Sequence, residues 1–436
     1  MRIAVAGTGY VGLVAGVCFA EVGHDVTCVD TDEAKLEPLR RGVSTIYEED
    51  LEELIQRNNA AGRIRYTTDC ESAYRDAEVV FIGVGTPERA DGSAELSFIA
   101  TAARQIAESV ERDCLVVVKS TVPVGTNDKV EQFIRDFLRS DVRVEVASNP
   151  EFLAQGSAVH DTLHAARVII GTDSLWAEDL LRKLYEPFGL PIVAVSRRSA
   201  EMTKLASNVF LALKISYMND IANLCELVGA NVEEVALGMS YDERIGSRFL
   251  KAGVGYGGSC FPKDTKALDY LAKANGYPLR TVQAAIDVNT DQRIALFRKA
   301  AKRLIAFRGL RVAVLGLTFK PGTDDLREAP ATDNIALLLG EGAELQAFDP
   351  VGRANSERVR PAGIHGLGSI AYVDSAETAL MGANVCFIFT EWPEIRDLAP
   401  QDFTRLMRTP LVYDGRNLFD PRVMSASGVE YYSVGR

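Results

Sequence analysis

The chain has 436 residues, of which 47% are hydrophobic and 25% are charged. This length favours about three domains with ordinary hydrophobic cores, and the net charge of −12 argues against a nucleic-acid or anionic-membrane surface, although not against a local basic pocket for a small anion. The seven cysteines are scattered and form no Cys-x-x-Cys pair or Cys/His cluster, which indicates buried thiols in a reducing compartment and no metal site.

The N-terminal segment carries a dinucleotide-binding pattern. A β-rich run at 2–6 leads into Gly7-Thr-Gly9-Tyr-Val-Gly12, and a helix-compatible segment follows at 13–22. In such a turn Gly7 permits the tight bend, Gly9 lets backbone approach a pyrophosphate, and Gly12 lets the helix pack on the strand. The N-terminus of the helix would face the phosphates. The spacing therefore predicts a dinucleotide site.

An acidic residue follows at the expected distance. Asp30 ends a second strand-like run, where a carboxylate accepts hydrogen bonds from a ribose 2′-hydroxyl. No arginine follows Asp30 directly, so we expect NAD rather than NADP. Residues 3–22 are largely apolar, but glycines interrupt them and no cleavage-type flank follows. We therefore expect neither a signal peptide nor a membrane span, and a cytoplasmic location.

The region from about 198 to 305 lacks strand-like runs and shows helical spacing. We expect one long helix from about Ala200 to Val228 and a second from Thr281 to Phe307. Long helices that join two α/β domains often form a dimer core, which predicts a homodimer. Lys204 and Asn208 lie four residues apart and hence on one helix face. They could form a solvated edge, or an ammonium and an amide could both face a substrate oxygen.

Cys260 lies in the run Gly-Val-Gly-Tyr-Gly-Gly-Ser-Cys-Phe-Pro-Lys-Asp at 253–264. A lone cysteine is most often a small buried residue. Here the neighbouring glycines would let backbone approach a ligand, and Lys263 could favour a thiolate. Asp264 could simply cap a helix at 265–275, or it could orient water beside the sulfur. Together with the dinucleotide pattern, this run indicates an oxidation through a covalent thiol adduct.

An internal repeat predicts the domain organisation. The paired segments are 2–7 with 311–316, 23–30 with 342–349, and 77–82 with 383–388. After Gly316 the glycine spacing is broken, so the second copy should bind a different nucleotide or none. We predict an α/β protein in which two Rossmann-like doubly wound domains are joined by a central helical domain with a long helix. The expected boundaries are 1–197, 198–305 and 306–436.

Eight motifs in order resemble the UDP-glucose/GDP-mannose dehydrogenase family, and within it the UDP-glucose 6-dehydrogenase branch. The motifs are Gly7-x-Gly9-x-x-Gly12, Gly83-Val-Gly85-Thr86-Pro87, Lys119-Ser-Thr121-Val-Pro123-Val-Gly-Thr126, Asn149-Pro150-Glu151-Phe152-Leu153, Lys204-x-x-x-Asn208, the Cys260 run, Phe319-Lys320 with Asp324-Asp325-Leu-Arg327-Glu-Ala-Pro330, and Asp414-Gly-Arg416. The resemblance covers essentially the whole chain. Taken together, these motifs are far more specific than any one of them.

The resemblance implies a role for each matching residue. It makes Cys260 the nucleophile, places Lys204 and Asn208 at the reacting oxygen, and assigns Asp264, Thr121 and Glu151 to placing water. The implied NAD-binding residues are Gly7, Gly9, Tyr10, Val11, Gly12, Asp30, Lys35, Thr86, Thr121, Lys263 and Arg327. The implied sugar-nucleotide residues are Glu151, Phe152, Leu153, Lys204, Asn208, Phe249, Gly257, Lys320 and Arg416, with Arg244 reaching the site of a partner subunit.

The resemblance implies four-electron oxidation of UDP-glucose to UDP-glucuronate with two NAD, through a thiohemiacetal and a thioester on Cys260. GDP-mannose is the alternative substrate, although Arg244-Ile-Gly-x-Arg-Phe and Cys260-Phe-Pro-Lys look more like the UDP-glucose branch. A two-electron β-hydroxyacid-type dehydrogenase is a further alternative, for which Cys260 and the second α/β unit are excess. A nucleotide-sugar sensor without catalysis is the third.

Overall fold

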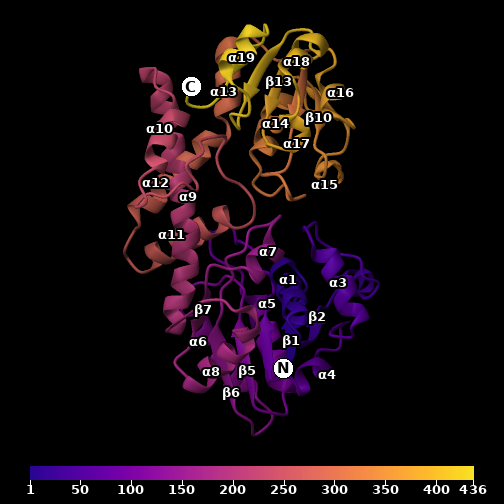
Figure 1. Ribbon diagram of the computed structural model, residues 1–436, viewed down its shortest axis with the longest axis vertical. Helices are drawn as coiled ribbons and strands as arrows, with labels where there is room; N and C mark the ends of the chain where they lie inside the picture. The colour runs from indigo at the N-terminus through magenta and orange to yellow at the C-terminus, as the bar shows by residue number, and fades with distance from the viewer. The chain divides into compact units, whose positions relative to one another are not determined.

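Two β-sheets, each dominated by parallel pairing, form the framework of the protein. The computed structural model describes residues 1–436 and divides into a first unit, Met1–Ser207, and a second unit, Asn208–Arg436. In both units short apolar strands alternate with helices (Figure 1). This alternation confirms the predicted fold class of two doubly wound α/β units, with a long helix between the two sheets in the sequence.

The first unit contains an eight-stranded sheet in the order β3-β2-β1-β4-β5-β6-β7-β8. Its strands are β1 (Arg2–Ala6), β2 (Asp25–Val29), β3 (Ile64–Thr67), β4 (Val79–Ile82), β5 (Cys114–Val118), β6 (Val144–Ser148), β7 (Val168–Gly171) and β8 (Ile192–Val195). Neighbouring strands are parallel except β6 and β7. The carboxyl ends of β1, β2, β4 and β5 therefore meet at one edge, where ligands bind in such sheets.

Helices cover both faces of this sheet because the strand residues alternate between two cores. In β1, Ile3 and Val5 belong to one core, whereas Ala4 and Ala6 belong to the other. The helices are α1 (Tyr10–Glu21), α2 (Glu33–Arg40), α3 (Leu51–Ala60), α4 (Cys70–Arg75), α5 (Ser97–Ser109), α6 (Thr126–Phe137), α7 (Ala158–Leu163) and α8 (Leu175–Tyr185). Burial on both faces explains why β1, β4, β5 and β7 read as nearly continuous apolar runs.

The second unit contains helices followed by a seven-stranded sheet in the order β11-β12-β10-β9-β13-β14-β15. Its strands are β9 (Arg311–Leu315), β10 (Glu344–Phe348), β11 (Gly363–His365), β12 (Gly368–Tyr372), β13 (Val385–Ile388), β14 (Leu411–Asp414) and β15 (Glu430–Tyr432). Its helices after the long α9 (Arg197–Val228) are α10 (Val232–Ser240), α11 (Phe261–Ala274), α12 (Arg280–Arg293), α13 (Ala295–Arg303), α14 (Pro330–Gly340), α15 (Arg353–Val359), α16 (Ala376–Leu380), α17 (Pro393–Arg396), α18 (Pro400–Leu406) and α19 (Pro421–Ala426).

The internal repeat is present in the topology, because β10-β9-β13 reproduces the order β2-β1-β4. Asp349 occupies the position that corresponds to Asp30, but it is buried. It accepts hydrogen bonds from the backbone of Leu317 and Gly352 and from the indole of Trp392. Hydrogen bonds within the protein thus occupy the carboxylate of Asp349, whereas Asp30 in the first unit lies nearer the surface.

The long helix predicted from Ala200 to Val228 is α9, which runs from Arg197 to Val228. It ends before Gly229, whose φ of 74° stops the helix. The single helix expected from Thr281 to Phe307 is wrong, because α12 ends at Arg293 and α13 begins two residues later. The side-chain amide of Asn334 donates to the carbonyl of Arg293 at 2.8 Å, so this carbonyl is already satisfied at the break.

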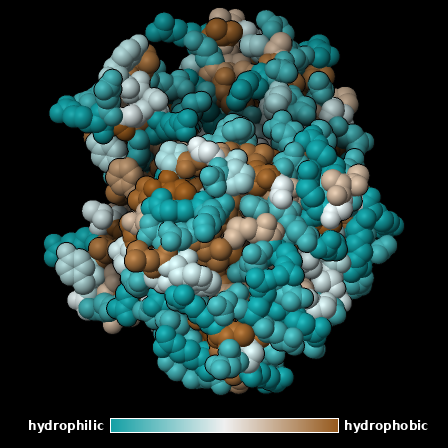
Figure 2. Space-filling model, turned by 60° about the horizontal axis from the view of Figure 1, so that its bottom comes forward, coloured by the Kyte–Doolittle hydropathy of each residue, from teal (hydrophilic) through white to brown (hydrophobic).

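The face of the protein drawn in Figure 2 is mostly hydrophilic. Figure 2 shows charged and polar residues over most of the face in view, with apolar residues gathered in smaller areas. No helix combines the length and apolarity that a bilayer crossing needs.

Candidate active-site residues

The predicted dinucleotide turn lies between β1 and α1. Gly7 has a φ of 96°, a conformation that favours glycine. A Cβ on Gly12 would lie 2.0 Å from the carbonyl oxygen of Gly7, so only glycine allows this contact between turn and helix. Gly9 precedes α1 and has no side chain to cap it, and a Cβ there would meet nothing within 4 Å. The open helix N-terminus suits a phosphate group.

Asp30 follows β2 at the same edge of the sheet. Its carboxylate accepts hydrogen bonds from the backbone N–H of Thr8 at 2.9 Å and from the Thr8 hydroxyl at 2.7 Å. Lys35 lies 3.7 Å away. Burial alone would raise the pKa of Asp30, but the hydrogen bonds from Thr8 and Asp32 and the charge of Lys35 together lower it. Asp30 is therefore an anionic acceptor, and the turn and the acid together fit an NAD molecule.

Two further predicted NAD residues meet beside this turn. Thr86 follows β4, and its hydroxyl donates to the backbone carbonyl of Thr121 at 2.9 Å. Thr121 follows β5, the neighbouring strand. The first unit thus brings to the loops and helix starts at one edge of its sheet the residues Gly7, Gly9, Tyr10, Val11, Gly12, Asp30, Lys35, Thr86 and Thr121.

Lys204 and Glu151 form a buried ion pair in the first unit. The ammonium nitrogen lies 2.9 Å from Oε1 of Glu151, and the two side chains are 3% and 6% exposed. The other carboxylate oxygen accepts the backbone N–H of Leu153 at 3.0 Å. The ring of Phe152 lies 5.4 Å from the ammonium and 3.7 Å from the guanidinium carbon of Arg167. Four predicted residues, Glu151, Phe152, Leu153 and Lys204, therefore lie together.

A second buried lysine had no predicted role. Lys119 follows the apolar run of β5, and its ammonium donates to the side chain of Asn149 at 3.0 Å. The pKa of Lys119 is lowered to about 8, mainly by burial and slightly by the charge of Lys204, while the charge of Glu151 opposes this lowering. The position of Lys119 directly after a fully apolar strand was the feature of the sequence that could have identified it as a buried lysine.

In the second unit, Cys260 occupies the N-cap position of the 14-residue helix α11. Its sulfur is partly buried, lies 3.9 Å from the hydroxyl of Ser259, and feels the charge of Arg327, whose pKa is raised mainly by Asp325 and further by Cys260. A helix N-terminus and a nearby guanidinium both favour a thiolate over a thiol. The environment of Cys260 is therefore that of a reactive cysteine.

Asp264 does not cap a helix at 265–275, as one interpretation of the sequence had it, because α11 already begins at Phe261. Its side chain is 1% exposed and accepts hydrogen bonds from the amide of Asn208 at 2.6 Å and from Lys263 at 2.7 Å. The Asp264 carboxylate thus faces Asn208 on α9 rather than the N-terminus of α11. Lys263 and Asp264 lie about one turn of α11 after Cys260, and Asn208 of α9 contacts Asp264 there.

Close packing explains the glycines of the cysteine loop. A Cβ on Gly257 would lie 2.2 Å from the carbonyl oxygen of Glu328, and one on Gly258 would lie 2.8 Å from the ring of Phe319. The N–H of Gly258 also donates to the carbonyl of Arg327 at 2.8 Å. The loop that precedes Cys260 therefore packs directly against the segment 319–328.

Several predicted sugar-nucleotide residues lie near the segment 319–328 or the start of α11. The guanidinium of Arg416 donates to the carbonyls of Phe319 at 2.9 Å and Phe389 at 2.7 Å. Lys320 lies 5.7 Å from the ring of Phe319. Phe249, which has a φ of 65°, stacks edge-on against Phe261 at 6.2 Å. Arg244 lies apart from them on the surface, with its side chain 89% exposed and its guanidinium paired to Asp242 at 2.6 Å.

Comparisons with known proteins cover the whole chain. Models of the UDP-glucose/GDP-mannose dehydrogenase family match three segments: the NAD binding domain at residues 1–189, the central domain at 198–291 and the UDP binding domain at 313–421. The chain is 47% identical to the UDP-glucose 6-dehydrogenase YwqF of Bacillus subtilis, over 100% of this chain and 98% of the relative. It is 45% identical to the UDP-glucose 6-dehydrogenase of Rhizobium meliloti, over 100% of both chains.

A solved UDP-glucose dehydrogenase from the archaeon Pyrobaculum islandicum is also similar. It is 36% identical, superposes with a TM-score of 0.91, and the match covers 99% of this chain and 96% of that one. The similarity in sequence and in structure extends through both units.

Proposed function

The chain belongs to the UDP-glucose/GDP-mannose dehydrogenase family, and from this premise we propose that it oxidises UDP-glucose to UDP-glucuronate through a covalent adduct on Cys260. It is an NAD-dependent dehydrogenase. The observation that carries the proposal is the position of Cys260 at the N-terminus of α11, beside Asp264 and Asn208. A dehydrogenase that removes only two electrons has no need of this thiol.

In the first oxidation, the ammonium of Lys204 and the amide of Asn208 hold the C6 oxygen as its proton is lost. Both groups stabilise developing negative charge, and the burial of Lys204 strengthens this effect. When bound, NAD accepts the hydride in each of the two oxidations. We assign its binding to Gly7, Gly9, Tyr10, Val11, Gly12, Asp30, Lys35, Thr86, Thr121, Lys263 and Arg327.

The resulting aldehyde carbon is trigonal and has no alkoxide beside its remaining hydrogen. The Cys260 thiolate adds to this carbon and forms a thiohemiacetal, which restores a tetrahedral centre that can lose a second hydride. The product of that loss is a thioester, and a water molecule cleaves it to the carboxylate and the free thiol. We assign the placing of this water to Asp264, Thr121 and Glu151, and the carboxylates of Asp264 and Glu151 can accept its proton.

Overall, one alcohol, two NAD and one water give one carboxylate, two NADH and three protons. Because the aldehyde stays bound to sulfur, it does not leave before the second oxidation. For the sugar nucleotide we propose contacts from Glu151, Phe152, Leu153, Lys204, Asn208, Phe249, Gly257, Lys320 and Arg416. The basic members of this set suit a diphosphate.

The yield of NADH per sugar tests the proposal. We expect two NADH for each UDP-glucose consumed and no comparable turnover of GDP-mannose, measured by absorbance and by chromatography of the sugar nucleotides. Two NADH from GDP-mannose alone would move the assignment to that substrate. A yield of one NADH would favour a two-electron dehydrogenase, and tight binding of either sugar without NADH would favour a sensor.

We also propose that the active form is a homodimer built on α9 and α10. An exposed apolar stripe follows α9 through Phe210, Tyr217, Leu224 and Leu227, whose spacing keeps them on one face. Tyr241 at the end of α10 is 81% exposed. Contiguous apolar side chains of this size on a helix are typical of a protein interface. Arg244 follows α10 and would reach the partner's sugar nucleotide.

Two variants separate the interface from the arginine. Leu227→Glu places a charge in the proposed interface, and we expect light scattering to show a monomer with little activity. Arg244→Ala should stay dimeric but raise the KM for UDP-glucose on the order of 10-fold or more, because a charge-assisted contact is lost. A fully active monomer of Leu227→Glu would contradict the dimer, and an unchanged KM in Arg244→Ala would contradict the contact.

The domain boundaries and the location remain part of the proposal. The division at 1–197, 198–305 and 306–436 is supported by the three matching family models, whose limits fall within these ranges. A cytoplasmic location is supported by the seven free cysteines, since a reducing compartment preserves thiols.

A further inference from the structure

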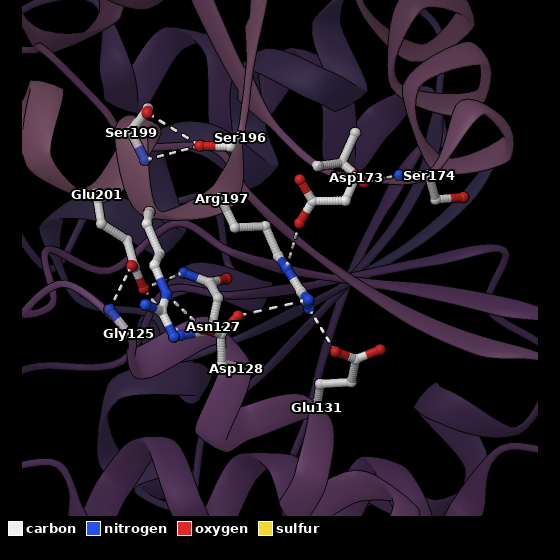
Figure 3. Close-up of polar contacts among 12 residues, drawn as sticks. Gly125, Asn127, Asp128, Glu131, Asp173, Ser174, Ser196, Arg197, Ser199 and Glu201 are labelled. Carbon is white, nitrogen blue, oxygen red and sulfur yellow. Dashed lines mark hydrogen bonds and ion pairs between the residues drawn. The ribbon is translucent and has the colours of Figure 1, made fainter.

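Glu201 is a buried carboxylate one helical turn before Lys204 on α9. Its side chain accepts three hydrogen bonds, from the backbone N–H of Gly125 at 2.6 Å and from the backbone N–H and side-chain amide of Asn127 at 2.8 and 2.6 Å. Figure 3 shows this carboxylate directed at the two residues of the facing segment. Only 2% of Glu201 is exposed, so solvent does not supply its partners.

The donors belong to the N-terminus of α6, which lacks a cap of its own. Gly125 occupies the N-cap position with a φ of 90°, and it has no side chain that could accept the free N–H groups. Most helices satisfy these donors with a local Ser, Thr, Asp or Asn. Here a carboxylate from α9 takes that place, and its negative charge also complements the positive end of the helix dipole.

The same stretch of α9 has further attachments within the first unit. Arg197 pairs with Glu131 of α6 at 2.7 Å and with Asp173 at 3.4 Å. Ala200 packs on β7, where a Cβ added to Gly171 would lie 2.4 Å from the Ala200 methyl group. Arg197 is accessible to solvent at its edge, whereas Glu201 is enclosed. The buried contact is thus the attachment that lies nearest to Lys204.

Helix geometry links Glu201 to Lys204. Residues three apart share a face of an α-helix and are separated by about 4.5 Å along its axis. Fixing the carboxylate of Glu201 therefore fixes both the rotation and the axial position of the Lys204 backbone. The donors Gly125 and Asn127 lie a few residues after Thr121, where the connection from β5 enters α6. The carboxylate of Glu201 therefore restrains this connection as well as α9.

We propose that Glu201 is a positioning residue for the oxidation, which holds Lys204 in the geometry of its pair with Glu151. The inference rests on the proposed function, because it assumes that Lys204 acts on the substrate oxygen. Glu201 does this through the backbone of α9 and the N-terminus of α6, without contact with the substrate. Its loss allows Lys204 to shift, and a shift of about 1 Å in a catalytic group can cost on the order of 10²-fold in rate.

The test compares Glu201→Ala and Glu201→Gln with Arg198→Ala as the matched control. Arg198 lies on the same turn and pairs with Asp128 at 2.8 Å, but its side chain is 72% exposed. Steady-state kcat and KM, the pH profile of kcat and thermal unfolding are measured for each protein. Active sites are counted by calorimetric binding of UDP-glucose, so that rates refer to folded protein only.

We expect kcat per active site to fall on the order of 10²-fold in Glu201→Ala and about 10-fold in Glu201→Gln, whose single oxygen can still accept from Asn127. The KM for NAD stays within twofold, and the pH profile of kcat shifts in both variants because the Lys204–Glu151 contact has changed. Arg198→Ala behaves as the wild type. Glutamine keeps the size of the side chain, so the Glu201→Gln variant still tests the role of the carboxylate if the Glu201→Ala variant does not fold.

A purely structural role gives a different pattern. In that case the midpoint of thermal unfolding falls while kcat per active site and its pH profile stay within twofold of the wild type, and this result would overturn the inference. Wild-type turnover is measured alongside. A wild type that does not oxidise UDP-glucose contradicts the proposed function, whereas an active wild type with an equally active Glu201→Ala contradicts the role of Glu201 alone.

Discussion

Replacing Cys260 with serine is expected to abolish the formation of UDP-glucuronate while leaving the binding of both ligands intact. A hydroxyl is not ionised near neutral pH, so the helix N-terminus at Cys260 has no thiolate to stabilise and the aldehyde is not captured. The rate of acid formation should fall by roughly 10³-fold or more, the scale on which loss of a covalent nucleophile acts. Chromatography of the sugar nucleotide together with NADH absorbance measures this loss.

The chain offers a matched control for this substitution. Cys70 is the other cysteine that is not fully buried, and it lies on α4 in the first unit. Cys70→Ser should retain wild-type rates and two NADH per sugar. Full conversion of UDP-glucose to the acid by Cys260→Ser would exclude the covalent mechanism, whatever Cys70→Ser does.

Lys204→Met should lower both the rate and the stability, for separable reasons. Loss of the ammonium removes charge stabilisation at the reacting oxygen, which is expected to cost on the order of 10²- to 10³-fold in kcat. It also leaves the carboxylate of Glu151 buried without its ion pair, and breaking such a pair costs about 3–5 kcal/mol of unfolding free energy. Rates and chemical denaturation are measured on the same preparations.

The double variant Lys204→Met/Glu151→Gln distinguishes the two effects. Neutral glutamine removes the unpaired charge, so we expect the double variant to regain most of the lost stability but none of the lost activity. If activity returned together with stability, Lys204 would serve the fold rather than the reaction, and the assignment of its ammonium to the substrate oxygen would be wrong.

Local patterns in the sequence predicted the parts of the structure that local geometry controls. The spacing of Gly7 and Gly12 reflects a turn in which a single Cβ does not fit, and this requirement is visible in a short stretch of chain. The repeat of 2–7 in 311–316 likewise predicted two sheets, because each copy forms an interior strand of its own sheet, with neighbours on both sides. The start of α9 was expected only three residues late.

Features that depend on distant partners were not predictable in this way. Asp264 looked like a helix cap because its partner Asn208 lies 56 positions away in the sequence. At the break between α12 and α13, the carbonyl of Arg293 accepts a hydrogen bond from Asn334, 41 positions further along the chain. Glu201 carried no signal at all, since its donors lie 74 and 76 positions before it and the cap that it replaces is a glycine.

The distribution of the cysteines bears on how the protein responds to electrophiles. Burial raises the pKa of Cys18, Cys28 and Cys114 to about 12, so these thiols stay protonated near neutral pH. Cys260 combines partial exposure with a helix end that favours the anion. We therefore expect a mild alkylating or oxidising agent to attack Cys260 before the other cysteines, which would make Cys260 a handle for selective labelling and equally the place where oxidative damage begins.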